Sequence, residues 1–162
     1  MNSDLEQAGT AAVCIVQARM GSQRLPGKMM EDLSGRPLMW HILQRAQQVG
    51  AGVPVVLATT DHERDDPLVA VAHAMKVAVV RGPEHDVLGR FLLALDHYPA
   101  RWVARVCGDS PLFDPVHLAQ WLELARHEGA DVVRFRDGVT SLLQGGEAVS
   151  YTHLTLPTNR EG

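Results

Sequence analysis

The sequence predicts an α/β fold, in which a mostly parallel sheet carries helices on both faces. Segments with the length and apolarity of strands alternate along the chain with segments whose apolar residues recur at helical spacing. The strand-like segments are continuously apolar, which is typical of parallel strands buried on both faces. A chain of 162 residues without a low-complexity linker is consistent with one domain.

The first strand is expected at residues 11–16, an uninterrupted apolar run. A helix is expected at residues 37–49, where apolar side chains recur at helical spacing. Pro37 suits the first turn of this helix, and Gly50 ends it. The glycines and the proline between these two elements indicate a loop.

A second strand is expected at residues 53–58, with a proline near its start. The helix that follows, residues 66–75, begins with Asp66 as the N-cap and Pro67 in the first turn. Residues 77–80 form a short apolar run that predicts the third strand.

The remaining elements continue the alternation. A helix is expected at residues 86–97, followed by a fourth strand at residues 101–107. Asp114 caps a helix at residues 114–127, and a fifth strand is expected at residues 131–135.

The loop after the first strand carries the strongest chemical signal. Its sequence is Ala18-Arg-Met-Gly-Ser-Gln-Arg-Leu-Pro-Gly-Lys28, and it has no acidic residue in a chain of net charge −4. The cations Arg19, Arg24 and Lys28, together with backbone N–H groups at the glycines, suit an anion and phosphate above all. Open α/β sheets bind ligands outside the carboxyl ends of their strands, where this loop lies. A solvated basic surface loop is the alternative.

Two common phosphate-binding loops do not match this segment. The nucleoside-triphosphate P-loop has four residues between its glycines and a Ser or Thr after its Lys. Here five residues separate Gly21 from Gly27, and Met29 follows Lys28. The dinucleotide fingerprint Gly-x-Gly-x-x-Gly is absent from the sequence.

The loop resembles the signature of the cytidylyltransferases that activate acidic sugars, and most closely the spore-coat polysaccharide branch, Ala-Arg-x-Gly-Ser-x-Arg-Leu-Pro-Gly-Lys. The resemblance implies a Rossmann-like, glycosyltransferase-A type of sheet. It also implies that Arg19 and Lys28 hold the triphosphate of CTP as catalytic residues. The backbone of Gly21 and Ser22 would lie against the triphosphate, and Ala18 would lie near the base.

A second motif ends the fourth strand, where Gly108-Asp-Ser-Pro-Leu112 follows Arg105-Val-Cys. A lone carboxylate at this edge suits Mg²⁺, which binds one or two carboxylates together with substrate phosphates. From the residues alone, a turn-capping Asp is nearly as plausible. The motif resembles the family's metal motif Gly-Asp-x-Pro-Leu, which implies that Asp109 binds magnesium. Arg24 and Arg105 are then candidate helpers, for phosphate and for sugar respectively.

A third segment, residues 81–90, also resembles the spore-coat branch and contains Asp86. Such a loop would face cytosine or sugar, which makes Asp86 a candidate substrate-binding residue. Asp86 as the cap of the following helix is the alternative, and both roles are compatible.

Composition bears on other classes of function. The mild negative charge argues against nucleic acid as a partner, because a phosphate-backbone binder needs a broad basic face. No apolar run approaches the length of a membrane span. Cys14 and Cys107 have no Cys-x-x-Cys partner and are expected to be reduced thiols of a cytoplasmic protein. Zinc-type His patterns and a Gly-x-Ser-x-Gly nucleophile motif are also absent from the sequence.

Three segments are expected along the chain: a disordered tail at residues 1–10, the nucleotidyltransferase domain at 11–148, and a non-native tail at 149–162. Residues 149–158 back-translate as GTC TCT TAT ACA CAT CTG ACG CTG CCG ACG, which resembles a transposon-based sequencing adapter. The domain is therefore expected to be incomplete at its C-terminus. The family's second acidic metal motif would then be missing, and a full-length relative would be a homodimer.

The resemblance implies an enzyme that transfers CMP from CTP to an acidic or modified sugar and releases pyrophosphate, for cell-surface polysaccharide biosynthesis. Two alternatives stay open. One is a glycosyltransferase that uses a nucleotide-sugar on the same fold. The other is a nucleotide-binding fragment without turnover, since the C-terminal half is expected to be absent.

Overall fold

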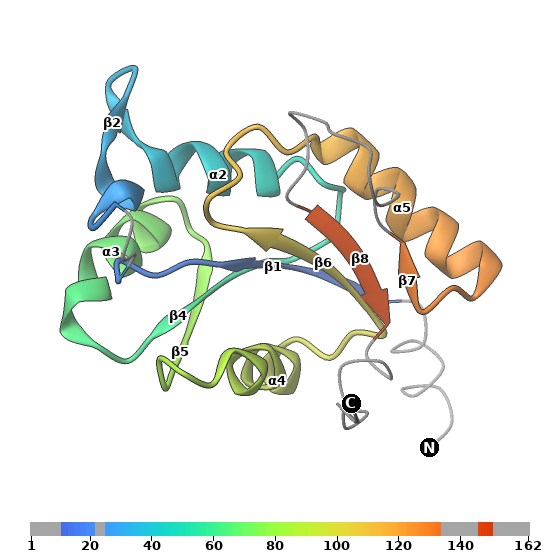
Figure 1. Ribbon diagram of the computed structural model, residues 1–162. Coiled ribbons are helices and arrows are strands. Elements are labelled where there is room, and N and C mark those ends of the chain that lie inside the picture. The colour runs from blue at the N-terminus through green and yellow to red at the C-terminus, as the bar shows by residue number, and fades with distance from the viewer. Residues whose placement is uncertain (1–10, 22–24, 134–145, 151–162) are drawn as a thin grey trace, which may run out of the picture.

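The computed structural model describes residues 11–21, 25–133 and 146–150, and its main feature is a six-stranded sheet in the order β5-β4-β1-β6-β8-β7 (Figure 1). Four neighbouring strands run parallel: β5 (Ala78–Gly82), β4 (Val55–Thr60), β1 (Ala12–Gln17) and β6 (Trp102–Cys107). β8 (Gly146–Ser150) is antiparallel to both β6 and β7 (Val132–Val133). The arrangement confirms the predicted α/β class with a mostly parallel sheet.

Helices cover both faces of the sheet (Figure 1). On one face lie α2 (Leu38–Ala46), α3 (Asp66–Ala74) and α5 (Pro115–Glu128), and on the other lies α4 (Val87–His97). None of the helices in the described parts of the chain is both long and apolar enough to cross a lipid bilayer.

The central strand β1 is apolar at every position except its last, without the alternation of a half-exposed strand. Cys14 and Val16 pack into the core beneath α2, α3 and α5, while Val13 and Ile15 pack into the core beneath α4. All four residues are fully buried. A strand with helices on both sides has no solvent-facing position, so polar side chains are excluded until its end at Gln17.

Short elements lie between the main ones and were not predicted. The 3-10 helix η1 (Lys28–Met30) follows the cationic loop, and η2 (Glu63–Asp65) immediately precedes α3. β2 (Asp32–Leu33) and β3 (Arg36–Pro37) form a small hairpin between η1 and α2.

Several elements begin or end one to three residues away from their expected positions. The helix predicted at residues 37–49 ends at Ala46, and the strand predicted at residues 131–135 begins at Val132, while residues 134 and 135 lie outside the described residues. The domain boundary predicted at residue 148 falls inside β8, since Val149 and Ser150 pair with β6 and are buried. The remainder of the expected tails, residues 1–10 and 151–162, lies outside the described residues.

Candidate functional site

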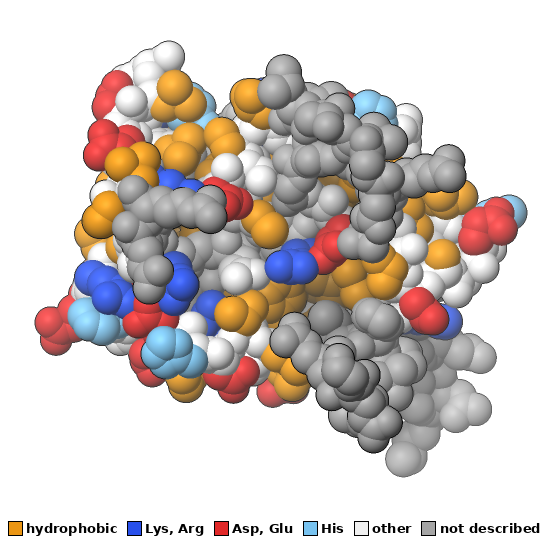
Figure 2. Space-filling view, viewed as in Figure 1, with side chains coloured by type: hydrophobic (Ala, Val, Ile, Leu, Met, Phe, Trp, Pro, Cys, Tyr) orange, Lys and Arg blue, Asp and Glu red, His pale blue; other side chains and the backbone are white. Residues whose placement is uncertain are grey.

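Four of the predicted site residues gather at the carboxyl ends of β1 and β6. A cleft of about 580 Å³ opens there, lined by Gln17, Ala18, Arg19, Leu25, Lys28, Met29, Arg90, Cys107, Gly108 and Asp109. It brings together four residues singled out from the sequence: Ala18, Arg19, Lys28 and Asp109. In Figure 2, basic, acidic and histidine side chains gather on the left of the molecule, the side toward which the β6 arrow points in Figure 1.

Gly108 brings the two strand ends into contact. Its N–H donates to the Gln17 carbonyl at 2.8 Å. A Cβ at this position would lie 2.7 Å from the Ala18 Cβ and 2.8 Å from the Gln17 carbonyl oxygen, so only glycine fits. This close approach sets Asp109, the next residue, beside the loop that begins at Ala18.

Lys28 reaches the same cleft from η1. Gly27 precedes η1 with φ 77°, a left-handed conformation that glycine adopts without strain. Met29 is buried in the core and so anchors the neighbouring Lys28. The Lys28 Nζ lies 3.7 Å from Asp109 Oδ2, and both side chains retain solvent exposure, 27% and 61%. An ammonium and a carboxylate thus face each other across the cleft in a loose ion pair.

Arg19 forms an ion pair with an acidic residue that the sequence did not reveal. Its Nη1 donates to Glu84 Oε1 at 2.9 Å, and Glu84 also pairs with Arg64. The backbone of Gly21 packs on this pair, since a Cβ there would lie 2.8 Å from Arg64 Nη2 and 2.9 Å from Glu84 Oε1. Glu84 belongs to the segment 81–90 that was selected for its motif, but its partner is 65 residues away.

Asp65 is the second residue that sequence reasoning missed. The predicted N-cap of α3 was Asp66, but Asp66 is the first residue of the helix, and the N-cap is Asp65, whose side chain makes no capping hydrogen bond. Asp65 is fully buried. Burial alone would raise the pKa of this carboxyl, but hydrogen bonds from Thr60, Met20 and Thr59 outweigh burial and hold the pKa below its usual range.

Arg90 is a buried cation at the cleft. It is 1% exposed, and its Nη1 donates to the carbonyls of Pro83 at 2.6 Å and Glu84 at 3.1 Å. Burial lowers the pKa of the Arg90 guanidinium, and nearby Arg19 lowers it further. Arg90 Nε and Gln17 Oε1 are buried polar atoms without a hydrogen-bond partner among the described residues. Both residues line the cleft.

The other predicted residues lie elsewhere or outside the described residues. Asp86 caps α4, since its Oδ1 accepts from the Gly89 N–H at 2.7 Å, which is the capping role left open by the sequence. Arg105 pairs with Glu147 of β8 at 2.5 Å, and neither Asp86 nor Arg105 lines the cleft. Ser22 and Arg24 lie outside the described residues.

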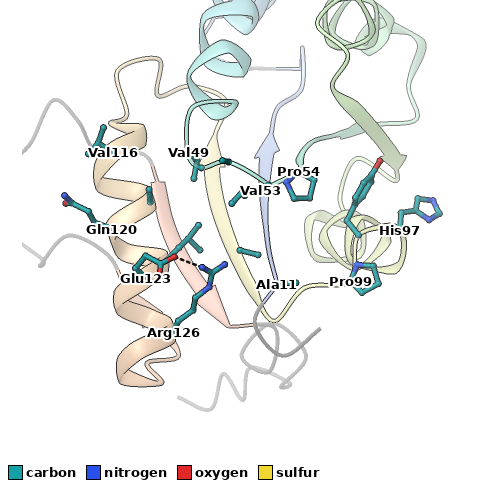
Figure 3. A pocket seen from close by; sticks show the side chains of 17 residues that line it. Ala11, Val49, Val53, Pro54, His97, Pro99, Val116, Gln120, Glu123 and Arg126 are labelled. Atoms are coloured by element: carbon teal, nitrogen blue, oxygen red, sulfur yellow. Dashed lines mark hydrogen bonds and ion pairs between the residues drawn. The ribbon is translucent and has the colours of Figure 1, made fainter. Parts of the chain in front are cut away.

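A larger cavity, about 850 Å³, lies at the opposite end of the sheet (Figure 3). Its lining is mainly apolar, includes Ala11, Val53, Pro54 and Pro99, and contains none of the predicted site residues. An ion pair between Glu123 and Arg126 of α5 lies along its side (Figure 3). The motif residues Arg19, Lys28 and Asp109 thus line the smaller cleft and not the larger cavity.

Comparison with known proteins gives a family match that covers most of the chain. The family model for cytidylyltransferases matches residues 13–162. The spore coat polysaccharide biosynthesis protein SpsF of Bacillus subtilis is 35% identical over 121 residues, which are 72% of this chain and 50% of that protein. A 3-deoxy-manno-octulosonate cytidylyltransferase of Erwinia tasmaniensis is 28% identical over 170 residues, which are 92% of this chain and 65% of that protein.

Solved structures give a similar result. A cytidylyltransferase from Leptospira borgpetersenii superimposes with a TM-score of 0.76 at 27% identity, covering 88% of this chain and 61% of that one. The CMP:2-keto-3-deoxy-manno-octonic acid synthetase complexed with CTP superimposes with a TM-score of 0.65 at 30% identity, covering 75% and 50%. The chain spans about half to two thirds of the length of these relatives.

Proposed function

Because this chain belongs to the cytidylyltransferase family, we propose that it binds CTP in the cleft at the carboxyl ends of β1 and β6 and transfers CMP to an acidic sugar. The observation that carries the proposal is the convergence of Arg19, Lys28 and Asp109, from two loops far apart in the sequence, on one cleft. The names of the relatives support the sugar class, since two of them act on 3-deoxy-manno-octulosonate or its synonym.

In the proposed reaction, a sugar hydroxyl oxygen attacks the α-phosphorus of CTP and gives up its proton to water. The bond from the α-phosphorus to the bridging oxygen of the β-phosphate breaks, and pyrophosphate leaves. The protein supplies positioning and charge rather than covalent chemistry. Arg19 and Lys28 hold the triphosphate, which takes the place of the carboxylates that they contact in this structure, Glu84 and Asp109.

Asp109 fits a divalent cation such as Mg²⁺. Its exposed carboxylate lines the cleft beside Lys28. Within the described parts of the chain, no cluster of three or more His, Cys, Asp or Glu side chains could hold a metal ion. A cation at Asp109 would therefore take its other ligands from phosphate oxygens and water, as Mg²⁺ commonly does. Bound there, it would neutralise phosphate charge.

The remaining predicted residues keep supporting roles in the proposal. Arg24 would assist at the phosphates, and the backbone of Gly21 and Ser22 would lie against them. Arg105 would reach the sugar only by leaving Glu147, with which it pairs at the neighbouring strand. The glycosyltransferase alternative is not favoured, because the matched family and the similar structures above are cytidylyltransferases.

Isothermal titration calorimetry with CTP, ATP and GTP in the presence of Mg²⁺ tests the binding step. The proposal predicts that CTP binds most tightly. Equal affinity for the three nucleotides would refute the cytidine assignment. Turnover is tested separately by pyrophosphate release from CTP with 3-deoxy-manno-octulosonate as the acceptor. CTP binding without this release would exclude 3-deoxy-manno-octulosonate as the sugar substrate.

A further inference from the structure

We propose that Asp65 is a positioning residue whose buried carboxylate holds the loop after β1 in the conformation that places Arg19 at the cleft. The inference rests on the proposed function, because it assigns Asp65 a part in binding CTP. Asp65 itself does not line the cleft, and it acts on the ligand through the loop.

The Asp65 carboxylate joins two segments of the chain. Its Oδ1 accepts from the Met20 backbone N–H at 2.8 Å, on the loop side. Its Oδ2 accepts from Thr59 Oγ1 at 3.0 Å and from the Thr60 N–H and Oγ1 at 3.1 and 2.5 Å, on the side of β4. One oxygen therefore serves the loop and the other serves the strand.

Four donors suit a charged carboxylate in particular. A carboxylate only accepts hydrogen bonds, and here both of its oxygens do so, Oδ1 from one donor and Oδ2 from three. A fully buried carboxylate is costly unless it is hydrogen-bonded in this way. An asparagine whose amide oxygen faces the three strand-side donors would turn its NH₂ group toward the Met20 N–H, so the loop-side contact would be lost and two donors would oppose each other. The arrangement therefore specifies Asp at position 65.

Met20, the residue next to Arg19, forms hydrogen bonds through both its backbone N–H and its backbone carbonyl. The Met20 N–H donates to Asp65, and the Met20 carbonyl accepts from the Gly27 N–H at 3.4 Å. The long bond to Gly27 is the weaker of the two. Loss of the Asp65 contact would thus free the backbone beside Arg19, whose own side chain is 45% exposed and so is poorly restrained by packing.

The test compares Asp65→Asn with Thr59→Val, a matched control that removes one hydrogen bond to Asp65 on the strand side and leaves the loop side intact. For each protein, the Kd for CTP is measured by calorimetry, the melting temperature is determined, and amide hydrogen exchange is followed over residues 18–21. We expect Asp65→Asn to weaken CTP binding about 10- to 100-fold, the loss typical of a misplaced site, and to speed exchange at Met20. Thr59→Val should lower the melting temperature with a CTP affinity within about threefold of the original.

Several outcomes would overturn the inference. Unchanged CTP affinity in Asp65→Asn would do so, as would an equal loss of affinity in Thr59→Val. If Asp65→Asn does not fold, exchange in the unaltered protein decides the matter, since an unprotected Met20 amide rules out the contact. If the unaltered protein binds no nucleotide, the proposed function fails, and the exchange rates of the two variants still show whether Asp65 holds the loop.

Discussion

Replacing Lys28 by methionine removes the ammonium group from the cleft and keeps most of the side-chain volume. The structure allows the effect on stability and the effect on ligand binding to be separated. In the free protein, Lys28 Nζ is 3.7 Å from Asp109 Oδ2, and both side chains are partly exposed. An exposed pair of this kind contributes about 0–1 kcal/mol, so the free energy of unfolding should change by less than about 1 kcal/mol.

The effect on CTP binding should be larger. A charge-assisted hydrogen bond to phosphate contributes about 1.5–3 kcal/mol, which corresponds to a Kd weakened about 10- to 150-fold. Calorimetry gives the Kd, and thermal unfolding without ligand gives the stability. Lys76→Met is the control, since Lys76 lies between α3 and β5, at the opposite end of the strands from the cleft. A Lys28→Met protein that loses stability without ligand but keeps its CTP affinity would refute the assignment of Lys28 to the triphosphate.

Three further predictions follow from the same contacts. Asp109→Asn should abolish the dependence of CTP binding on Mg²⁺ concentration, measured by titration of the metal at fixed CTP; an unaltered metal dependence would exclude Asp109 as the ligand. Glu84→Gln should release Arg19 and tighten CTP binding by about two- to fivefold, as expected for an exposed ion pair; unchanged or weaker binding by calorimetry would show that Glu84 does not compete with the phosphates. Because the pKa of Asp65 is lowered by folding, its contribution to stability is present above the unfolded value of about 3.9 and is lost as the pH falls through the lower folded value. The free energy of unfolding, measured with urea between about pH 2 and pH 6, should therefore fall toward acid pH, and it should fall less in Asp65→Asn. The same pH dependence in both proteins would contradict the ionised state of Asp65.

Most elements of the sheet were predictable because burial on two faces leaves a strong signal in the sequence. β1, β4, β5 and β6 all begin and end within two residues of their predicted bounds. β8 was missed, since its five residues pair with β6 and β7 only through tertiary contacts, and Gly146 at its start resembles a loop. Short antiparallel strands of this kind carry little local signal.

Some residues of the candidate site were predictable from the sequence and others were not. Arg19, Lys28 and Asp109 stand in motifs whose spacing is visible in the sequence, and the structure places all three at one cleft. The roles of Glu84 and Asp65 depend on partners 65 and 45 residues away, so no local pattern reveals them. For Asp65 the local pattern was also ambiguous, because two adjacent aspartates precede a proline and either could cap the helix.

Amide hydrogen exchange with and without saturating CTP and Mg²⁺, mapped over the described residues, is a direct test of the proposed CTP site. If CTP binds in the cleft, exchange should slow in the segments that form it, residues 17–21, 25–29 and 107–109, and should not change in residues 97–99 and 119–126 beside the larger cavity. Slower exchange around the larger cavity, or no change at the cleft while calorimetry shows CTP bound, would contradict the proposed site.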